Sequence, residues 1–176
     1  QCARHDTGAR RVHHASHTNN HAATDSAFGH TRFMQFNCTS ANGGQATIHN
    51  VIKFCDNKHV DVALISETWW NSTSRQPPAL RGWQIYFKNR HSSHAGPRGG
   101  GVAILVQNSI PSRQIPYTGP SEIVFAEIDI DDFPQLRVGS AYVAPQALGE
   151  LKTIETFLRD DSREAFIAGD FNARHA

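Results

Sequence analysis

The sequence has few cysteines and no long apolar run, and both absences restrict the class of protein. Its three cysteines, Cys2, Cys38 and Cys55, are odd in number and show no C-x-x-C spacing. This argues against a disulfide framework and against a cysteine zinc site, so we expect a reducing, intracellular compartment. No apolar run approaches the length that a helix needs to cross a bilayer. We therefore expect no membrane partner.

Acidic residues are absent from a long central stretch. Between Thr68 and Ser121 there is no Asp or Glu. The basic residues of this stretch are Arg75, Arg81, Lys88, Arg90, Arg98 and Arg113. From Glu122 onward the acidic residues outnumber the basic ones. A chain of net charge +1 can therefore still present a basic face to a phosphate backbone.

Residues 1–32 show no apolar periodicity and are rich in His, Ala, Thr, Asn and Arg. Six histidines lie here: His5, His13, His14, His17, His21 and His30. A metal-binding tract is one interpretation, but the composition favours a disordered linker, which we exclude from the fold. Residues 33–176 are expected to form one domain. Because the chain starts at Gln1 without a signal-peptide pattern, we expect an internal piece of a longer product.

Hydrophobic periodicity predicts two helices and seven strands in residues 33–176. Apolar residues at helical spacing predict helices around Ile48–Cys55 and Leu151–Leu158. Apolar or alternating runs predict strands at Phe33–Cys38, Val60–Ser66, Trp83–Phe87, Val102–Val106, Ile123–Ile130, Leu136–Val143 and Ala165–Ala168. Antiparallel hairpin signals beside two helices indicate an α+β layered domain rather than a doubly wound sheet.

Two of these strands carry further expectations about burial. Val102–Val106 is apolar enough to be buried on both faces, whereas Glu127 and Asp129 alternate with apolar residues and predict one wet face. The preceding run Gly99–Gly101 lacks the Lys-Ser/Thr of a phosphate loop and opens a strand. Close backbone packing explains these glycines better than phosphate binding does.

Polar side chains follow or end four of the predicted strands. Asn37, Glu67 and Tyr142 stand at three strand ends, and Asp170 and Asn172 leave the last strand two residues apart. Such residues can converge on one rim of a sheet. Carboxylate and amide oxygens suit a hard cation, and a carboxylate can orient or deprotonate a water. The scarcity of His and Cys near these strands makes zinc a poor fit.

Each residue also has a structural interpretation. Asn37 could form a turn before the next glycine pair, and Glu67 could cap the following turn. Tyr142 could be a half-buried strand aromatic, and Asp170 with Asn172 could form an Asx turn. The pattern as a whole is more specific than any one of its parts.

The order of the motifs resembles the endonuclease/exonuclease/phosphatase superfamily. The motifs are Phe36-Asn37-Cys38, Ser66-Glu67-Thr68-Trp69, Arg98-Gly99-Gly100-Gly101-Val102-Ala103-Ile104-Leu105, Ala141-Tyr142-Val143-Ala144-Pro145 and Gly169-Asp170-Phe171-Asn172. The arginine-triglycine strand and the ending Asp-Phe-Asn-Ala are most similar to the endonuclease domain of non-LTR (LINE-like) retrotransposon polyproteins. The likeness covers about Phe33 to His175. It implies a four-layered α/β sandwich of two packed mixed sheets flanked by helices.

The resemblance also implies an activity, a cofactor and residue roles. The activity is a phosphodiesterase dependent on Mg²⁺, with Mn²⁺ possible, which nicks DNA. Glu67 would bind the metal, with Asn37 supporting the metal and the phosphate. Tyr142 would hydrogen-bond a phosphate oxygen, Asp170 would orient or deprotonate the attacking water, and Asn172 would stabilise the charged transition state. A reverse transcriptase would belong to the same polyprotein, and the enzyme would act on chromosomal DNA in the nucleus.

The sequence departs from the family pattern in one respect. The Ser-Asp-His motif that closes the site in family members does not follow Asn172, and His175 is too near in sequence to replace it. We therefore expect a sandwich that is incomplete at the C-terminus, an uncovered apolar sheet face and little activity. Two alternatives stay open: a non-catalytic remnant or weak nucleic-acid-binding fragment, and a phosphatase of the same superfamily.

The central basic stretch could supply a DNA-binding surface. It contains all three tryptophans together with Tyr86 and Phe87, and Arg or Lys interleaved with aromatics suits nucleic acid. The alternative is a solvated face over ordinary core aromatics. With the resemblance, we predict DNA contact by Arg75, Arg90 and Arg98.

Overall fold

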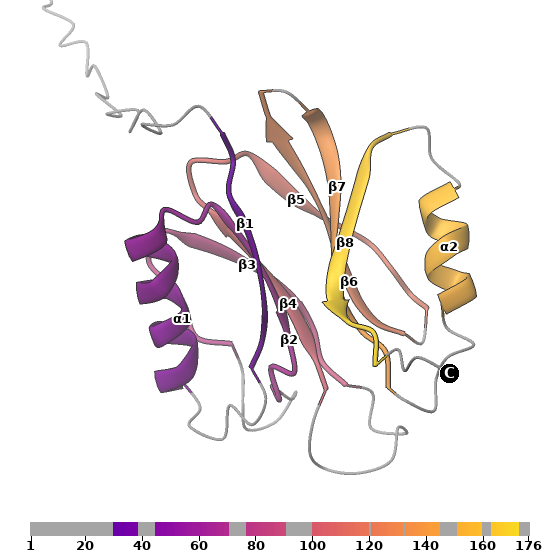
Figure 1. Cartoon of the computed structure of the whole chain (residues 1–176), viewed down its shortest axis with the longest axis horizontal. Helices are drawn as coiled ribbons and strands as arrows, with labels where there is room; N and C mark the ends of the chain where they lie inside the picture. Colours follow the sequence, from indigo (N-terminus) through magenta and orange to yellow (C-terminus); the bar gives the residue numbers. More distant parts are fainter. Residues whose placement is uncertain are drawn as a thin grey trace, which may run out of the picture.

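The structure is a computed structural model that describes residues 30–38, 45–70, 77–90, 100–119, 121–131, 133–144, 151–159 and 163–172. Within these residues, two four-stranded sheets pack face to face, with one helix on the outer side of each (Figure 1). Neither helix is long and apolar enough to cross a bilayer. The predicted linker 1–32 lies outside the described part of the chain except for its last three residues.

The first sheet has the strand order β1-β2-β4-β3. Its strands are β1 (Phe33–Asn37), β2 (Val62–Ser66), β4 (Val102–Gln107) and β3 (Trp83–Lys88). β1 and β2 are parallel, whereas β4 is antiparallel to both β2 and β3. Parallel neighbours need a crossover connection, and helix α1 (Gln45–Lys58) provides it.

Helix α1 follows from local sequence at its buried face and at its end. Ile48, Val51 and Cys55 recur at helical spacing and are buried against the sheet. The helix ends where His59 adopts a left-handed conformation with φ of 53°. The amide of Val60 then donates to the carbonyl of Cys55 at 2.9 Å, which closes the last turn as in a Schellman motif.

The second sheet has the strand order β5-β6-β7-β8. Its strands are β5 (Ser112–Ile115), β6 (Glu122–Ile130), β7 (Phe133–Tyr142) and β8 (Ala165–Asp170). β5, β6 and β7 are antiparallel neighbours, and β8 is parallel to β7 after the crossover helix α2 (Leu151–Arg159). Each sheet therefore carries one parallel pair at its edge, joined through a helix.

Three apolar clusters hold the four layers together. The one between the sheets joins Leu64 and Ile104 of the first sheet to Val124 and Val138 of the second. A second cluster lies under α1, and a third places Ile154 of α2 against the other sheet. The order helix, sheet, sheet, helix confirms the predicted four-layered sandwich of two mixed sheets.

The two edge strands β1 and β8 lie side by side although they are far apart in sequence (Figure 1). The rings of Phe33 and Phe166 meet edge to face with centroids 5.5 Å apart. At the other end of the same strands, Asn37 hydrogen-bonds Asp170. Stacking of the sheets therefore brings together two segments that the sequence separates by most of the domain.

All seven predicted strands and both helices are present, and one strand escaped prediction. β5 is a four-residue edge strand of mostly polar residues, with Pro111 before it and Pro116 after it. It has no apolar alternation because it lies at the sheet edge, where side chains face solvent. The expectation that Val102–Val106 is buried on both faces is confirmed, since these five residues are fully buried.

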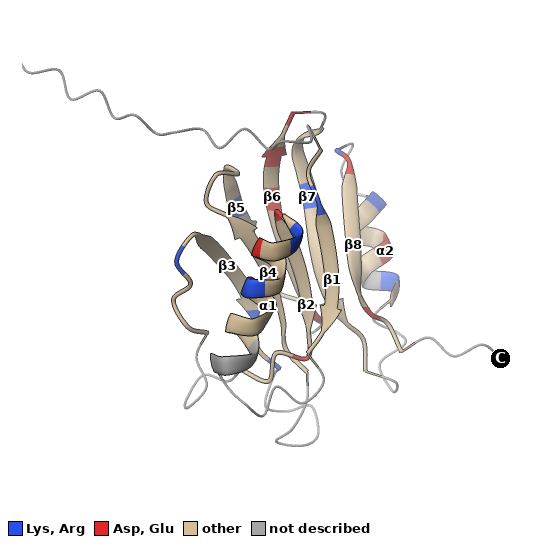
Figure 2. Ribbon diagram, turned by 60° about the vertical axis from the view of Figure 1, so that its left-hand side comes forward, with Lys and Arg blue, Asp and Glu red and all other residues tan. Residues whose placement is uncertain are grey.

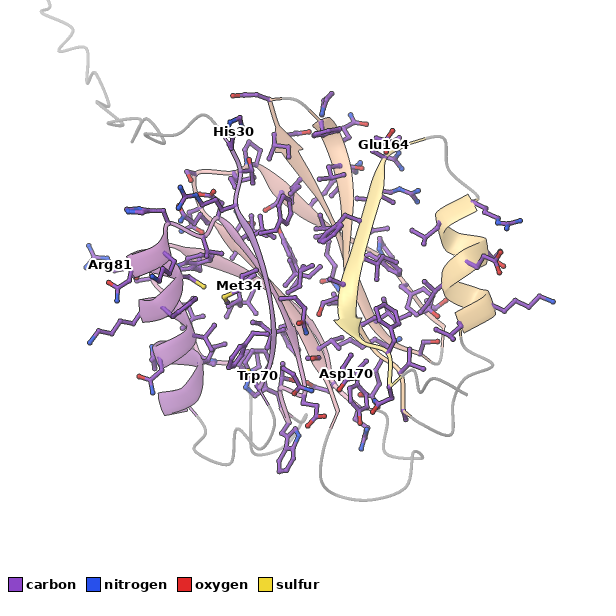
Figure 3. All side chains as sticks on the ribbon, viewed as in Figure 1. His30, Met34, Trp70, Arg81, Glu164 and Asp170 are labelled. Carbon is purple, nitrogen blue, oxygen red and sulfur yellow. The ribbon has the colours of Figure 1, made fainter. Side chains whose placement is uncertain are left out.

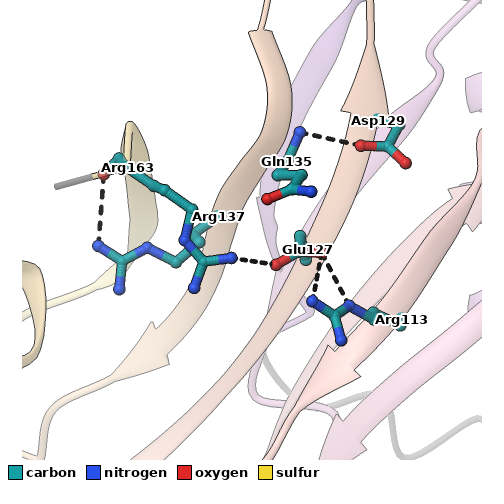
Figure 4. A network of polar contacts seen from close by, with 6 residues as sticks. All are labelled: Arg113, Glu127, Asp129, Gln135, Arg137 and Arg163. Carbon is teal, nitrogen blue, oxygen red and sulfur yellow. Dashed lines mark hydrogen bonds and ion pairs between the residues drawn. The ribbon is translucent and has the colours of Figure 1, made fainter. Parts of the chain in front are cut away.

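The predicted wet face of β6 is wrong at Glu127. Glu127 is only 6% exposed, and its neighbour Arg137 on β7 is only 3% exposed. The reason is electrostatic: Glu127 forms ion pairs with Arg113 and Arg163, which lets a charged side chain be buried (Figure 4). Asp129, the other acid of the alternation, is exposed as expected.

Candidate active site

One end of the sandwich collects the polar residues that end its strands. Parallel strands of a sheet end at the same edge, so β1 and β2 deliver Asn37 and Glu67 there, and β7 and β8 deliver Tyr142 and Asp170. We call this end the rim; its residues are Asn37, Glu67, Tyr142, Asp170 and Asn172. Figure 3 shows Asp170 and Trp70 at this end, with His30 and Glu164 at the opposite one.

The centre of the rim is an amide placed between two carboxylates. The Asn37 Nδ2 atom donates to Asp170 Oδ2 at 2.9 Å and to Glu67 Oε1 at 3.4 Å. The three side chains come from different strands of both sheets and are partly buried. Two carboxylates brought so close together repel one another unless a donor or a cation lies between them.

Glu67 points to the rim because the chain bulges at this residue. In the ladder Ser66 pairs with Val102, but beyond it Thr68 N donates to Gly101 O and Trp69 N to Gly100 O. Glu67 is thus one extra residue on its strand, and its φ of 56° is left-handed. Bulges of this kind re-aim a side chain next to active sites, and a non-glycine residue in this region carries backbone strain.

Asp170 is held in place by both of its oxygens. Oδ1 accepts a hydrogen bond from the backbone N of Asn172 at 3.0 Å, while Oδ2 accepts the bond from Asn37. The first contact is the Asx turn that was one interpretation of this segment. Asn172 itself has a φ of 45°, and its Nδ2 donates to Val143 O at 2.9 Å. Turn and site are therefore compatible, since the turn fixes how the carboxylate faces Asn37.

Tyr142 lies beside an ion pair that the sequence did not reveal. Its Cα pairs with Asp170 on one side and with Glu122 on the other. Arg90 Nε donates to Glu122 Oε1 at 2.7 Å, and its guanidinium lies 5.4 Å from the centroid of the Tyr142 ring. A cation over an aromatic ring at this distance is attracted by it. Glu122 carries one sequence signal: it is the first acid after the acid-free stretch.

Two pKa shifts describe the electrostatics of the rim. The pKa of the Cys38 thiol, next to Asn37, rises to about 11, mainly because of burial and further because of the charge of Glu67. Burial lowers the pKa of Arg90, but its hydrogen bond to Glu122 and the charge of Glu122 outweigh this and raise it overall. The charge of Glu67 therefore acts on the Cys38 thiol in addition to burial, and the Glu122 carboxylate stabilises the charged form of Arg90.

Buried polar atoms without a hydrogen-bond partner in the described part of the chain gather around the rim. They include Ser66 Oγ, Thr68 Oγ1, Trp69 Nε1, Asn89 Oδ1 and Ser121 Oγ. Ser66 directly precedes the bulge and is fully buried. Leaving a buried polar atom unpaired costs about 1–3 kcal/mol. Such a concentration at one end is typical of a site that holds water, an ion or a polar ligand.

The donor set fits a hard cation. Glu67, Asp170 and Asn37 offer only oxygen ligands, and Mg²⁺ is commonly held by one or two carboxylates together with waters and substrate phosphates. No group of three or more His, Cys, Asp and Glu side chains that could hold a metal occurs among the described residues. The oxygen donors of the rim therefore suit a hard divalent cation.

The structure brings together the five predicted site residues and places Arg90 beside them. Arg75 and Arg98 lie outside the described residues. The predicted close packing of the glycine run is seen at Gly100 and Gly101, where an added Cβ would lie 2.3 Å from Arg90 Nε and 2.5 Å from Thr68 Oγ1, respectively. Sequence reasoning gave no role to Ser66, although it stands in the motif of Glu67, or to Glu122, which belongs to no motif.

Comparisons with known proteins agree with this fold. The endonuclease/exonuclease/phosphatase family matches residues 34–176. The endonuclease domain of TRAS1, a telomere-specific non-LTR retrotransposon, superposes with a TM-score of 0.58 at 19% identity, covering 83% of this chain and 61% of that one. An AP endonuclease from Archaeoglobus fulgidus gives a TM-score of 0.57 at 19% identity, covering 82% and 58%.

A third solved structure extends the range of similar proteins. A family protein from Leptotrichia buccalis gives a TM-score of 0.58 at 15% identity and covers 82% of this chain and 69% of its own. At these identities the likeness shows the fold. The chain spans about three fifths of the TRAS1 endonuclease domain. No curated protein sequence matches it.

Proposed function

The chain belongs to the endonuclease/exonuclease/phosphatase family, and from this premise we propose that it is the endonuclease part of a retrotransposon protein, which nicks DNA by metal-dependent hydrolysis. The similarity to the TRAS1 endonuclease domain and to an AP endonuclease supports the choice of DNA as substrate. The observation that carries the proposal is the Asn37 amide placed between the carboxylates of Glu67 and Asp170.

Glu67 is the proposed metal ligand, with Asn37 in support, and Mg²⁺ is the proposed ion with Mn²⁺ as a substitute. When bound, the ion would supply a Lewis acid to the phosphoryl oxygens. The bulge presents the Glu67 carboxylate at the rim, and the hydrogen bond from Asn37 limits how far it can turn away.

Asp170 is the proposed residue that orients or deprotonates the attacking water. Its two oxygens are each fixed by one donor, from Asn172 N and Asn37 Nδ2. Each oxygen keeps a second acceptor site, so a water can bind a carboxylate whose direction is already set. Fixing the base before the substrate arrives reduces the entropy that must be lost in the transition state.

Tyr142 and Asn172 are the proposed hydrogen-bond donors to the phosphate. Donors that are already directed at the developing charge stabilise the transition state more than donors that must reorient. Tyr142 is half-buried between its strand partners, and Asn172 follows Asp170 on the same strand exit. Asn172 keeps one amide hydrogen beyond the bond to Val143 O.

The wider setting is also a proposal. DNA contact by Arg75, Arg90 and Arg98 stays a prediction, as do a reverse transcriptase in the same polyprotein and action in the nucleus. The acid-free stretch supports DNA contact by Arg75 and Arg98, because few carboxylates near them in sequence compete with phosphate. Arg90 is already paired with Glu122, so this support does not extend to it.

A plasmid-nicking assay with Mg²⁺ tests the proposal. The chain should convert supercoiled plasmid to the open circle, and Glu67→Ala should reduce the rate about 100-fold or more, since it removes the proposed metal ligand. Asp129→Asn is the matched control, because Asp129 is an exposed acid at the other end of the sandwich that bonds only the backbone of Gln135 in the described residues. Its rate should match the wild type.

Two outcomes would replace the proposal. Equal nicking by the wild type and Glu67→Ala would remove the enzymatic assignment and leave a non-catalytic remnant or a weak nucleic-acid-binding fragment. Cleavage of inositol or lipid phosphates with DNA left intact would assign the chain to the phosphatases of the family.

A further inference from the structure

Arg90 and Glu122 form an ion pair that joins the two sheets at the rim. Arg90 follows β3 of the first sheet, whereas Glu122 begins β6 of the second. The pair is close and shielded: Arg90 Nε lies 2.7 Å from Glu122 Oε1, and the two side chains are 17% and 9% exposed. A shielded pair of this kind is costly to form and more costly to break from one side. A costly pair beside the proposed site is therefore expected to serve that site.

The second carboxylate oxygen of Glu122 is connected to Glu67 through hydrogen bonds of the backbone. Oε2 accepts a hydrogen bond from the backbone N of Gly101 at 2.6 Å. The carbonyl of the same Gly101 accepts the amide of Thr68 at 3.1 Å, the residue directly after the bulge. Because Glu67 is the extra residue of this ladder, a shift of Gly101 would change the direction of its carboxylate.

Arg90 contacts Tyr142 directly. Its guanidinium lies over the Tyr142 ring, 5.4 Å from the ring centroid. Tyr142 in turn pairs with Glu122 across β6 and β7. Arg90, Glu122 and Tyr142 thus form a closed set of contacts, in which the arginine fixes the ring and the glutamate fixes the arginine.

Glycine is required where the pair meets the first sheet. Gly100 has a φ of 73°, and a Cβ added there would lie 2.3 Å from both Arg90 Nε and Glu122 Oε2. The ion pair therefore occupies the space that any side chain at this position would need. The ion pair and the left-handed backbone therefore explain why position 100 is a glycine.

We propose that Arg90 and Glu122 are positioning residues. Together they fix the orientation of the proposed metal ligand Glu67 and of the proposed phosphate donor Tyr142. This rests on the proposed function of those two residues. Glu122 acts on Glu67 through Gly101 and Thr68, and Arg90 acts on Tyr142 directly. The pair coordinates parts of the site that come from different sheets, and this role does not require Arg90 to contact DNA.

The chain offers a matched control for the test. Glu127 lies on the same strand β6, has a similarly buried side chain and is also paired with arginine, but it lies five residues further along the strand, in its other half. Glu122→Gln and Glu127→Gln are compared with the wild type at equal fractions folded. Arg90→Lys keeps the charge but loses the planar fork, and Arg90→Met removes both.

The first readout is metal affinity, measured by titrating the whole chain with Mn²⁺ alone. Glu122→Gln should weaken Mn²⁺ binding about tenfold, the lower end of what loss of a supporting residue costs a metal site. Glu127→Gln should leave it unchanged. Equal weakening by both variants, or none by Glu122→Gln, would overturn the inference.

The second readout needs no metal. Hydrogen exchange of the Thr68 and Trp69 amides should be faster in Glu122→Gln but unchanged in Glu127→Gln. The ring resonance of Tyr142, assigned with Tyr142→Phe, should shift in Arg90→Met. In Arg90→Lys it should return part of the way to its wild-type position. Wild type that binds Mn²⁺ no better than Glu67→Gln would refute the proposed function alone. The exchange and ring signals would then still decide whether the pair positions both residues.

Discussion

The two ends of the sandwich both carry charged side chains, but they neutralise them differently. At the end opposite the rim, which we call the far end, Arg113, Glu127, Arg137 and Arg163 lie together (Figure 4). There Glu127 meets two arginines, each within 2.7 Å. At the rim, Glu67 and Asp170 share one amide and form no ion pair among the described residues. Among the described residues, the Glu127 carboxylate at the far end therefore has arginine partners, whereas the two carboxylates of the rim have none.

This difference separates a structural use of charge from a functional one. Figure 2 shows the strands of the first sheet almost free of charged residues along their middles, so charge is reserved for the ends. A buried carboxylate between arginines needs nothing further. Two carboxylates on one amide, beside buried polar atoms that have no partner in the described part of the chain, would gain stability from a cation or a polar ligand. The comparison therefore points to the rim as the site.

The largest expected effect is a difference in nicking rate between a variant at the rim and a variant at the far end. Asp170→Asn should lower the rate of plasmid nicking by a factor of about 10²–10⁴, the usual contribution of a positioned general base. Asp129→Asn, at the far end, should leave the rate unchanged. The assay compares initial nicking rates in Mg²⁺ at equal protein concentration. Similar rates for both variants would remove the functional distinction between the two ends.

The next effect concerns stability at the rim. Gly100→Ala should lower the free energy of unfolding by about 2–4 kcal/mol, because the new Cβ meets the Arg90–Glu122 pair and the backbone is left-handed. Gly82→Ala shares the left-handed backbone, with φ of 86°, but its Cβ would meet nothing within 4 Å. It should cost only about 1 kcal/mol. Urea unfolding of both variants measures the difference, and equal losses would show that the pair does not constrain Gly100.

A smaller effect is expected at acidic pH and belongs to the far end. The hydrogen bond from Arg113 holds the pKa of Glu127 below its ordinary 4.5, although burial acts in the opposite direction. A carboxyl with a lowered folded pKa contributes stability above the unfolded value and loses it as the pH falls through the folded one. The free energy of unfolding should therefore fall below pH 4.5, and less steeply in Glu127→Gln. Parallel curves for the two proteins would contradict this.

The smallest effect uses Cys38 as a reporter of charge at the rim. Its thiol pKa of about 11 reflects burial first and the charge of Glu67 second. Glu67→Gln should lower the Cys38 pKa by less than about one pKa unit, because burial remains. The Cys55 thiol, also near 11 from burial and from Asp56, should not change. Thiolate absorbance against pH in single-cysteine variants measures both, and an unchanged Cys38 would show that Glu67 exerts no charge there.

The fold could be predicted almost completely because its elements are defined by local pattern. Residues 62–65 and 102–106 are buried on both faces and apolar throughout, so their sequence alone predicts strands. β5 could not be predicted, since a short polar edge strand owes its conformation to its partner β6. The burial of Glu127 could not be predicted either, because it also depends on partners that are distant in sequence. Its arginine partners come from β5 and from the residues before β8.

The candidate site was predicted as a set of residues, whereas its geometry was not. The order of Asn37, Glu67, Tyr142, Asp170 and Asn172 in their motifs was enough to name them together. Nothing in the sequence shows that Glu67 is the extra residue of a bulge, because the bulge exists only relative to the opposite strand at Gly101. The sequence likewise does not show that Asn37 donates to two carboxylates, since Asp170 reaches it across the stacked sheets.

The sequence by itself determined where the strands and helices lie and which residues end them, because periodicity and strand-end chemistry are properties of neighbours along the chain. Only the tertiary structure decided which charges are neutralised and which are left for a ligand. Glu127 has arginine partners, whereas Glu67 has no basic partner among the residues that the structure describes, although both are acids beside apolar strand residues. The physical reason is that charge is compensated through space, by side chains that folding brings from other strands.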